Sequence, residues 1–447
     1  MTPSRPLVLQ AEWVLPVASP PIRDGSLLIG SDGRIARLGP RAEVPVPDEA
    51  RVIELGAATL LPGLVNVHTH LELTGFEANA DGLEFSSWIG TIRARKEARS
   101  GPEYDAAARM GLEECWAGGV TTVADTGDSG SVPRVLAELG GSGLAYLEVF
   151  GPDPRQAETS FNDLVERVRA VPAVAGARVR VGVSPHAAYT VSGPLFARVA
   201  RWAREEGLPL AVHLAESAAE SDLVVRGSGP FSEAWARRGI PPLADPAQRS
   251  AGFPEARLVP LPASPVGWLG SLGVLGPETL CIHAVDLSDF DVRTLSDSGA
   301  AVAHCPVSNL RHGHGTARLG AMREAGIRVG LGTDSVASVG RLDLFAEMRA
   351  AREGGGLSDP EALALGTREG ARALGLDREL GTLEPGKWGD VAVLRGAPPA
   401  ADPVAGAVGS GPDDVMLTVL AGRVVYQALE PGSRSSAGTL QAPRAPR

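Results

Sequence analysis

Histidines stand at the ends of apolar runs in this sequence. The run "LPGLVNVHTH" ends in His68 and His70, which are separated by one residue. Side chains two apart on a strand point to the same side, so both imidazoles are expected to face one cavity. Neutral imidazole is a good ligand for zinc or iron(II). The pair taken alone leaves a packed or surface role equally open.

Two other apolar runs carry further potential metal ligands at or near their ends. "LPLAVHL" contains His213, and "IRVGLGTD" ends in Asp334. Three imidazoles and one carboxylate can hold a single divalent cation and leave room for water. We therefore predict one metal ion, with zinc expected and iron as the alternative, held by His68, His70, His213 and Asp334.

Glu216 and His283 are candidates for proton transfer beside that ion. Glu216 lies three residues beyond His213, just outside the strand, where a carboxylate can face whatever lies on the metal. The alternative is a glutamate in the first turn of a helix, which the helix dipole favours. His283 ends the run "TLCIH", and its alternative is a core histidine bonded to a backbone carbonyl.

The motif "AHCPVSNL" is predicted to support the site rather than to react. Ser308 and Asn309 are expected to donate or accept hydrogen bonds behind the reacting groups. His312 and His314, in "RHGHG", repeat the spacing of a ligand pair. Their flanking glycines and the lack of a partner carboxylate favour a mobile loop, and His304 receives no role.

The elements that position these residues alternate between strand and helix. Amphipathic segments such as 103–119 and 194–207 separate the β-rich runs. Repeated alternation is typical of a (β/α)8 barrel of the TIM type, whose chemistry lies at the C-terminal ends of its strands. The connection 215–278 is too long for one helix, and its Pro-rich part, 241–265, is predicted to be a surface loop. The predicted barrel strands are 61–68, 120–125, 144–150, 178–186, 208–214, 279–285, 300–305 and 327–334.

Short β runs with turns occupy both ends of the sequence. Residues 1–60 and 379–428 are predicted to form one small β-sandwich domain beside a barrel of residues 61–378. Residues 429–447 have the composition of a disordered tail.

The composition of the chain argues against several kinds of binding partner. The chain has 42 basic and 53 acidic residues and a net charge of −11, which argues against nucleic acid or an anionic membrane as a partner. No run approaches the roughly 20 apolar residues of a membrane helix. Three scattered cysteines, Cys115, Cys281 and Cys305, form no metal or disulfide pattern and favour the cytoplasm. A homodimer remains open.

Together these motifs resemble the amidohydrolase superfamily, in particular its mononuclear nucleoside and nucleobase deaminases and chlorohydrolases. The resemblance implies the metal ligands already named, with Glu216, His283 and Asp334 as catalytic residues and His186 as a contact to the substrate base. Val183, Ser184 and Pro185 stand where binuclear members carry a lysine, so a single metal is expected. The matching motifs are "LPGLVNVHTH", "SPHAAYTVS", "VHLAES", "CIHAVD", "HCPVSNL", "LGTDS" and "GTLEPGKWGDVAVL".

The segment after the first histidine pair resembles one particular group of deaminases within this superfamily. "LELT" followed by "LEFSSWIGTIRARK" is similar to the 6-aminodeoxyfutalosine deaminases of menaquinone biosynthesis. That likeness implies conversion of 6-aminodeoxyfutalosine to futalosine and ammonia, with a cation near the carboxylate of the substrate. The candidate substrate contacts are His186, Glu72, Trp88, Arg93, Arg95 and Ser308.

Other interpretations stay open on the sequence alone. Segment 85–96 also fits a solvated helix face with Trp88 in the core. The substrate could be adenosine, S-adenosylhomocysteine or guanine, or the enzyme could be a chlorohydrolase or amide hydrolase. A binding protein without catalysis is the third class.

Overall fold

A barrel of parallel strands forms the centre of the molecule. The computed structural model describes residues 5–76, 82–171, 178–250, 261–396 and 402–428. Within them, eight parallel strands follow one another in chain order, which confirms the predicted barrel. The tail 429–447 lies outside the described residues. The strands are β6 (Leu64–Thr69), β7 (Val120–Gly127), β8 (Ser142–Val149), β9 (Arg178–Pro185), β10 (Leu210–Leu214), β11 (Thr279–His283), β12 (Ala301–His304) and β13 (Arg328–Leu331).

The first and last barrel strands meet at their C-terminal ends. The backbone N–H of Asp334 donates to the carbonyl of His68 at 3.1 Å. Nearer their beginnings, α16 (Arg368–Ala373) packs against both strands, and Val65 donates to the carbonyl of Gly366. Its Ala371 shares one apolar cluster with side chains of several barrel strands. The interior is therefore filled at the N-terminal end, and the other end is left for the site.

Helices connect the strands on the outside of the barrel. A capping box of Ser100 and Glu103 begins α2, and Gly207, with φ 65°, ends α5. The helices outside the 215–278 connection are α1 (Phe85–Ala98), α2 (Gly101–Ala117), α3 (Ser131–Leu139), α4 (Ala157–Ala170), α5 (Gly193–Glu206), α10 (Asp289–Ser298), α11 (Pro306–Arg311), α12 (Leu319–Glu324), α13 (Val336–Val339), α14 (Leu344–Gly355), α15 (Asp359–Leu365), α16 and α17 (Pro403–Gly409).

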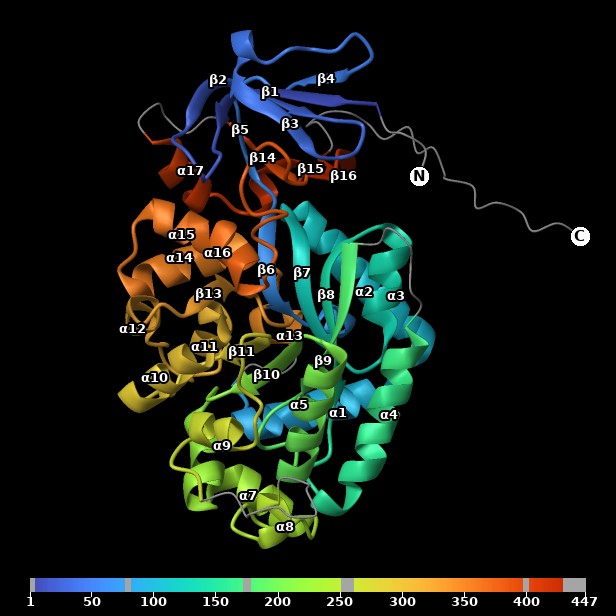
Figure 1. Ribbon diagram of the computed structural model, residues 1–447, viewed down its shortest axis with the longest axis vertical. Coiled ribbons are helices and arrows are strands. Elements are labelled where there is room, and N and C mark those ends of the chain that lie inside the picture. Colours follow the sequence, from blue (N-terminus) through green and yellow to red (C-terminus); the bar gives the residue numbers. More distant parts are fainter. Residues whose placement is uncertain (1–4, 77–81, 172–177, 251–260, 397–401, 429–447) are drawn as a thin grey trace, which may run out of the picture.

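The predicted excursion between β10 and β11 is present, and it lies beyond the C-terminal end of the barrel (Figure 1). It contains α6 (Ala218–Ser221), α7 (Gly229–Arg237), α8 (Pro246–Arg249) and α9 (Pro265–Ser271). Residues 251–260 are not described. The described part of the Pro-rich stretch lies mostly at the surface, as predicted, but it contains the short helix α8 and is anchored at Gln248. Gln248 of α8 is buried and donates to the carbonyls of Pro152 and Pro241, so this segment packs against the barrel.

The two ends of the chain build one small sheet at the opposite pole of the molecule (Figure 1). The boundary predicted after residue 60 falls inside β5, and Gly63 then separates β5 from β6. A Cβ at Gly63 would lie 2.2 Å from Thr121 Oγ1, so the tight junction requires glycine. In chain order the strands are β1 (Leu7–Val14), β2 (Ile22–Ile29), β3 (Ile35–Pro40), β4 (Arg51–Glu54), β5 (Ala58–Pro62), β14 (Val391–Arg395), β15 (Val415–Leu420) and β16 (Arg423–Gln427).

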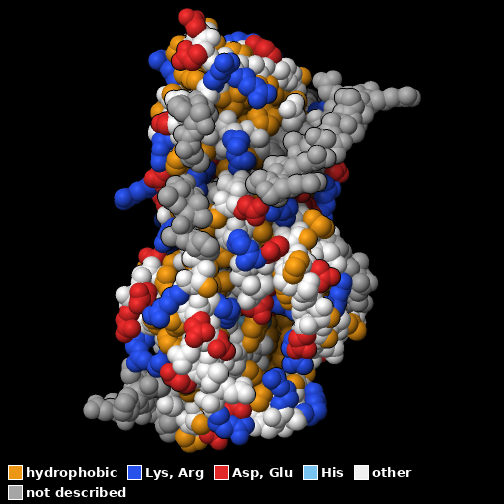
Figure 2. All heavy atoms as spheres, turned by 90° about the vertical axis from the view of Figure 1, so that its right-hand side faces the viewer, with side chains coloured by type: hydrophobic (Ala, Val, Ile, Leu, Met, Phe, Trp, Pro, Cys, Tyr) orange, Lys and Arg blue, Asp and Glu red, His pale blue; other side chains and the backbone are white. Residues whose placement is uncertain are grey.

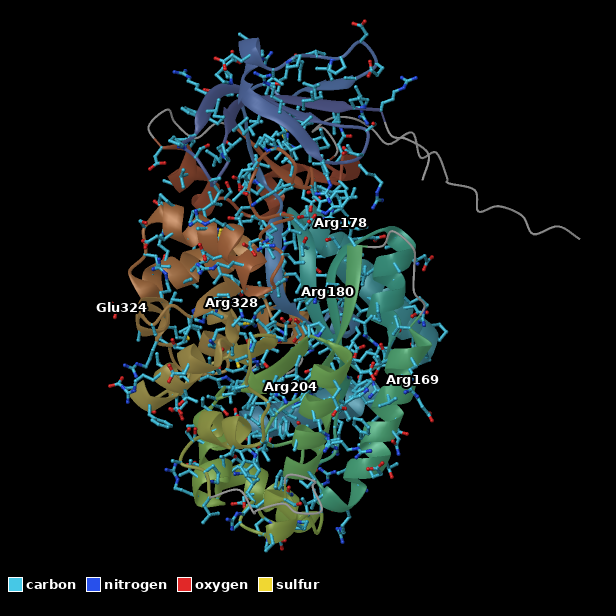
Figure 3. All side chains as sticks on the ribbon, in the orientation of Figure 1. Arg169, Arg178, Arg180, Arg204, Glu324 and Arg328 are labelled. Carbon is cyan, nitrogen blue, oxygen red and sulfur yellow. The ribbon has the colours of Figure 1, made fainter. Side chains whose placement is uncertain are left out.

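An ion pair joins the barrel to this sheet. Arg178, at the start of β9, donates to both carboxylate oxygens of Asp390, at 2.8 and 2.6 Å, and lies over the Trp388 ring. Figure 3 labels Arg178 at this junction and Arg180 two residues further along β9. The Asp390 side chain is only 4% exposed. Loss of Arg178 would therefore leave a nearly buried carboxylate without its cation.

Arg178→Met is expected to destabilise the protein by about 3 kcal/mol, a cost typical of breaking a buried pair from one side. Arg180→Met is the matched control, because Arg180 is exposed on the same strand. Urea titration followed by circular dichroism measures both changes. Equal urea midpoints for the two variants would show that the Arg178–Asp390 ion pair does not stabilise the junction between the barrel and the small sheet.

The distribution of surface charge and the state of the cysteines match what the composition indicates. Acidic and basic side chains are interspersed on the face shown in Figure 2. None of the helices in the described ranges has the length and apolar character needed to cross a membrane. Cys115, Cys281 and Cys305 are buried and unpaired, as expected. The cytoplasmic location and the homodimer stay predictions.

Candidate functional site

A cavity of about 420 Å³ opens at the C-terminal end of the barrel. Phe85, Trp88, Ile89 and Ile92 of α1 form an apolar wall on one side. A hollow of about 560 Å³ elsewhere, beside Leu15 and α15, has neither histidine nor cysteine among its described lining residues. The polar and charged residues lining the first cavity are His70, Arg93, Lys96, Glu97, Tyr104, Asp128, Glu148, His186, Tyr189, Thr190, His213, Glu216, Arg238, His283, Asp334 and Ser335.

Four predicted metal ligands come together at the base of this cavity. Asp334 Oδ1 lies 3.4 Å from His70 Nε2 and 3.6 Å from His68 Nε2. The ring centroid of His213 is 5.0 Å from that of His68 and 5.5 Å from that of His70. Four groups contributed by β6, the residue that follows it, β10 and the segment after β13 thus face one point.

The hydrogen bonds of these histidines fit a divalent cation at that point. His70 Nδ1 donates to the carbonyl of Thr126 at 2.8 Å, and His213 Nδ1 donates to the carbonyl of His186 at 3.2 Å. Each donation leaves the lone pair on Nε2 free. The buried ring of His68 has no hydrogen-bond partner for either nitrogen among the described residues. Metal-binding histidines are commonly oriented through the second nitrogen in this way.

The backbone is strained where the strands deliver these groups. His283 has φ 71° and Asp334 has φ 59°, values that side-chain-bearing residues rarely adopt. Ala215 and Ala284 are also in this region, with φ 51° and 50°. Such strain is concentrated at functional sites, where the surrounding structure enforces it.

Asp334 is held as an anion. Ser308 Oγ donates to its Oδ2 at 2.7 Å, and the backbone N–H of Ser335 donates to its Oδ1 at 2.6 Å. Burial acts to raise the pKa of Asp334, but the neighbouring His68 and His70 hold that pKa well below its ordinary value. Ser308 is absent from the described lining of the cavity, so it supports Asp334 rather than reaching a substrate.

Glu216 is contacted from several directions. Tyr189 donates to Glu216 Oε2 at 3.0 Å, and Glu216 Oε1 lies 3.5 Å from His283 Nε2 and 3.7 Å from His314 Nδ1. Burial, with the charge of Asp334, raises the pKa of Glu216 to about 8. The carboxyl group is therefore protonated at neutral pH and carries a proton that it can give away.

Two further histidines have defined orientations. His283 Nδ1 donates to Asn309 Oδ1 at 2.9 Å, so its Nε2 faces Glu216 as an acceptor. Thr190 donates to the carbonyl of Ala187, and its Oγ1 therefore accepts from His186 Nδ1 at 2.7 Å. Asn309 has the supporting role that we predicted, and His186 lines the cavity.

Glu72 does not reach the cavity. Its side chain is 1% exposed, and its oxygens accept from the backbone N–H groups of Asp128 and Ser129 and from the Ser129 hydroxyl. Lys96 lies 3.1 Å from Glu72 Oε1. With its acceptor sites used inside the protein, Glu72 holds Lys96 and does not contact a substrate.

The arginines proposed for the far end of the substrate separate into two groups. Arg93 lines the cavity, exposed and 3.5 Å from Glu97. Arg95 instead donates to the carbonyls of Gly75 and Phe76 and lies over the Phe76 ring, outside the described lining. Trp88 lines the cavity. Arg95 therefore secures the start of the segment before α1.

Several residues at the cavity were missed in the sequence. Glu148 ends β8, so the reasoning applied to the histidines at strand ends would have found it. His314, which we predicted to be on a mobile loop, packs its ring against Phe85 and lies beside Glu216. Arg238 follows α7 in the excursion, and no sequence signal linked it to the site. His304 is buried and belongs to none of the candidate ligand groups in the described residues.

Comparison with known proteins places the chain in a family. Residues 59–425 match the model of the amidohydrolase family. The chain is 29% identical over 442 residues to the 5-methylthioadenosine/S-adenosylhomocysteine deaminase of Symbiobacterium thermophilum, covering 94% of this chain and 93% of that protein. It is 33% identical to the deaminase of the same name from Nitratidesulfovibrio vulgaris strain Miyazaki F, covering 91% and 88%.

A solved structure has the same fold. The zinc-bound adenosine deaminase of Xanthomonas campestris superposes with a TM-score of 0.76 at 24% identity, covering 94% of this chain and 92% of that one. The family match spans the barrel and the strands β5, β14 and β15 of the small sheet, and it begins after β1 to β4. On this evidence the chain belongs to the amidohydrolase family.

Proposed function

We propose that the protein is a metal-dependent deaminase of aminopurine nucleosides, with 6-aminodeoxyfutalosine as its substrate. Family membership makes it a hydrolase that acts on carbon–nitrogen bonds. The observation that carries the proposal is the convergence of Glu216 and His283 with four metal-ligand side chains at the base of one cavity. The names of the two relatives support a nucleoside as the substrate class.

His68, His70, His213 and Asp334 would hold one divalent cation. We propose zinc, the ion bound in the Xanthomonas campestris structure. When bound there, the ion would act as a Lewis acid and lower the pKa of a water molecule toward ~7. The water would bind the ion in addition to the three imidazoles and the carboxylate of the donor set.

The protein's own groups move the protons. Asp334 accepts one proton from the attacking water and later delivers it to the leaving amine, which departs as ammonia. Glu216 donates its proton to the ring nitrogen next to the reacting carbon, and His283 Nε2 orients the water. As the carbonyl forms, Glu216 regains a proton from the hydroxyl group that came from water.

An ammonia-release screen tests this function. The panel contains adenosine, S-adenosylhomocysteine, guanine and 6-aminodeoxyfutalosine, together with a chlorotriazine and an amide for the other activities of the superfamily. We expect the highest kcat/KM for 6-aminodeoxyfutalosine. Faster release of chloride, or of an amine from the amide, would replace the proposal with the second class of hydrolase.

The carboxylate end of the substrate would meet the arginines at the mouth of the cavity. Arg93 and Arg238 line it; Arg93 lies 3.5 Å from Glu97, and Arg238 is exposed, with the charge of Asp153 near it. Losing a hydrogen bond to a charged group costs about 1.5–3 kcal/mol. Arg238→Ala or Arg93→Ala is thus expected to raise KM for 6-aminodeoxyfutalosine roughly 10-fold and to leave adenosine kinetics nearly unchanged.

Arg95→Ala is the matched control for Arg93→Ala, because Arg95 lies on the same helix, α1, but outside the described cavity lining. Steady-state kinetics on both nucleosides give the comparison. Equal losses of kcat/KM on the two substrates for Arg93→Ala and Arg238→Ala would show that neither arginine binds the substrate carboxylate.

A further inference from the structure

A cluster of charged side chains in the cavity has no part in the proposed proton transfers. Lys96 Nζ lies 2.5 Å from Asp128 Oδ1, 3.1 Å from Glu72 Oε1 and 4.0 Å from Glu148 Oε2. Lys96, Asp128 and Glu148 line the cavity, whereas Glu72 does not. The cluster therefore presents the ammonium of Lys96, the carboxylate of Asp128 and the carboxyl group of Glu148 to a ligand.

The charge of Lys96 is already offset inside the protein. Glu72 and Asp128 both contact its ammonium group, and the three surrounding carboxylates raise the pKa of Lys96 above its ordinary value despite burial. Burial raises the pKa of Glu148 to about 8, so its carboxyl group is uncharged at neutral pH. A ligand anion would gain little from the Lys96 ammonium and would meet Asp128 as a repelling charge. The cluster is unsuited to a carboxylate or phosphate, and the nearby ammonium also disfavours a second metal ion.

Glu148 has an acceptor that nothing in the protein satisfies. Its side chain is 2% exposed, and Oε1 is buried without a hydrogen-bond partner among the described residues. A buried acceptor without a donor is unfavourable, and a ligand hydroxyl or amine would relieve it. Asp128, 34% exposed, lies on the other side of Lys96 and offers a second acceptor to the same ligand.

We propose that Lys96, Asp128 and Glu148 form a subsite for the vicinal hydroxyl groups of a nucleoside sugar. Oxygens of Asp128 and Glu148 accept from the hydroxyls, and the ammonium of Lys96 donates to a hydroxyl oxygen. Glu148 has a ligand atom within 4.8 Å of one on His186, which adjoins the metal ligand His213. One nucleoside could then contact His186 with its base and this subsite with its sugar. The inference rests on the proposed function and adds the sugar requirement to it.

The test compares the nucleoside that is turned over fastest in the ammonia screen with its 2′,3′-dideoxy form. For the wild-type protein we expect kcat/KM to be roughly 10- to 100-fold higher with the hydroxyls present. Glu148→Gln and Asp128→Asn should each lower that ratio several-fold, mainly through KM of the hydroxylated substrate. The 3′-phosphate of the same nucleoside should be a poor substrate for the wild-type protein.

Glu113→Gln, an exposed change on α2, is the control and should keep the wild-type ratio. Metal content and melting temperature are measured for every variant. Equal kcat/KM for the two nucleosides with the wild-type protein would overturn the subsite and leave the deaminase proposal standing. The subsite would also be overturned if Glu148→Gln and Asp128→Asn left the ratio of kcat/KM for the two nucleosides unchanged. Absence of ammonia from every nucleoside would overturn both.

Discussion

Glu216→Gln is expected to lower kcat by roughly 10²–10⁴-fold, the range of general acid–base contributions, while metal content stays at the wild-type level. The amide keeps the shape of the carboxyl group and its contacts with Tyr189 and His283. It cannot give a proton to the ring nitrogen and take one back. Stopped-flow absorbance and elemental analysis of the same preparation separate turnover from metal binding.

Glu220→Gln is the matched control for that loss. Burial raises the pKa of Glu220, like that of Glu216, to about 8. Its oxygens accept from the backbone N–H groups of Ala215 and Glu216, so its amide variant should affect stability more than kcat. Wild-type kcat in Glu216→Gln with normal metal content would disprove the proton-transfer role.

His68→Ala should remove the metal and the activity together. Its ring is fully buried, neither nitrogen has a hydrogen-bond partner in the described residues, and the carboxylate 3.6 Å away, Asp334, is itself a proposed ligand. The proposed ion therefore accounts for the position of the ring. Mutation of a residue that only hydrogen-bonds a metal ligand lowers metal affinity by about 10–100-fold. Loss of the ligand His68 itself should lower metal affinity by at least that much. Metal per chain after dialysis, and activity with and without added zinc, measure the effect.

His304→Ala is the control, because His304 is also buried at a strand end but belongs to no candidate ligand group in the described residues. It should keep its metal. The wild-type protein should carry one ion per chain. Two tightly bound ions per chain would contradict the mononuclear assignment, and full metal retention by His68→Ala would remove that residue from the ligand set.

The barrel was predictable because its strands are short apolar runs with a polar residue at the C-terminal end. His68, His213 and His283 each end such a run, and parallel strands bring their ends together. The junction at Gly63 was missed. The run 61–68 was taken as one strand, although the Pro62–Gly63 pair inside it is a turn signal at the point where the small sheet ends and the barrel begins.

The cavity wall was predicted less well than its base. Arg93 and Arg95 are equally basic neighbours on one segment, and only the folded helix separates them, one toward the cavity and one toward Phe76. Arg238 reaches the site through the excursion after β10, whose path has no periodic signal. Glu72 was misplaced because its spacing from His70 suggested a shared face, whereas the chain leaves the strand there as a short turn.

The small sheet has a consequence for biosynthesis. Strand β5 pairs with β1 on one side and with β14 on the other, so its second neighbour is made only after the whole barrel has been translated. Until then the nascent chain exposes an unpaired, apolar strand edge, which is a template for association with other chains. A ribosome pausing after residue 378 would prolong this exposure, so chaperone demand during synthesis should depend on the last strands rather than on the barrel.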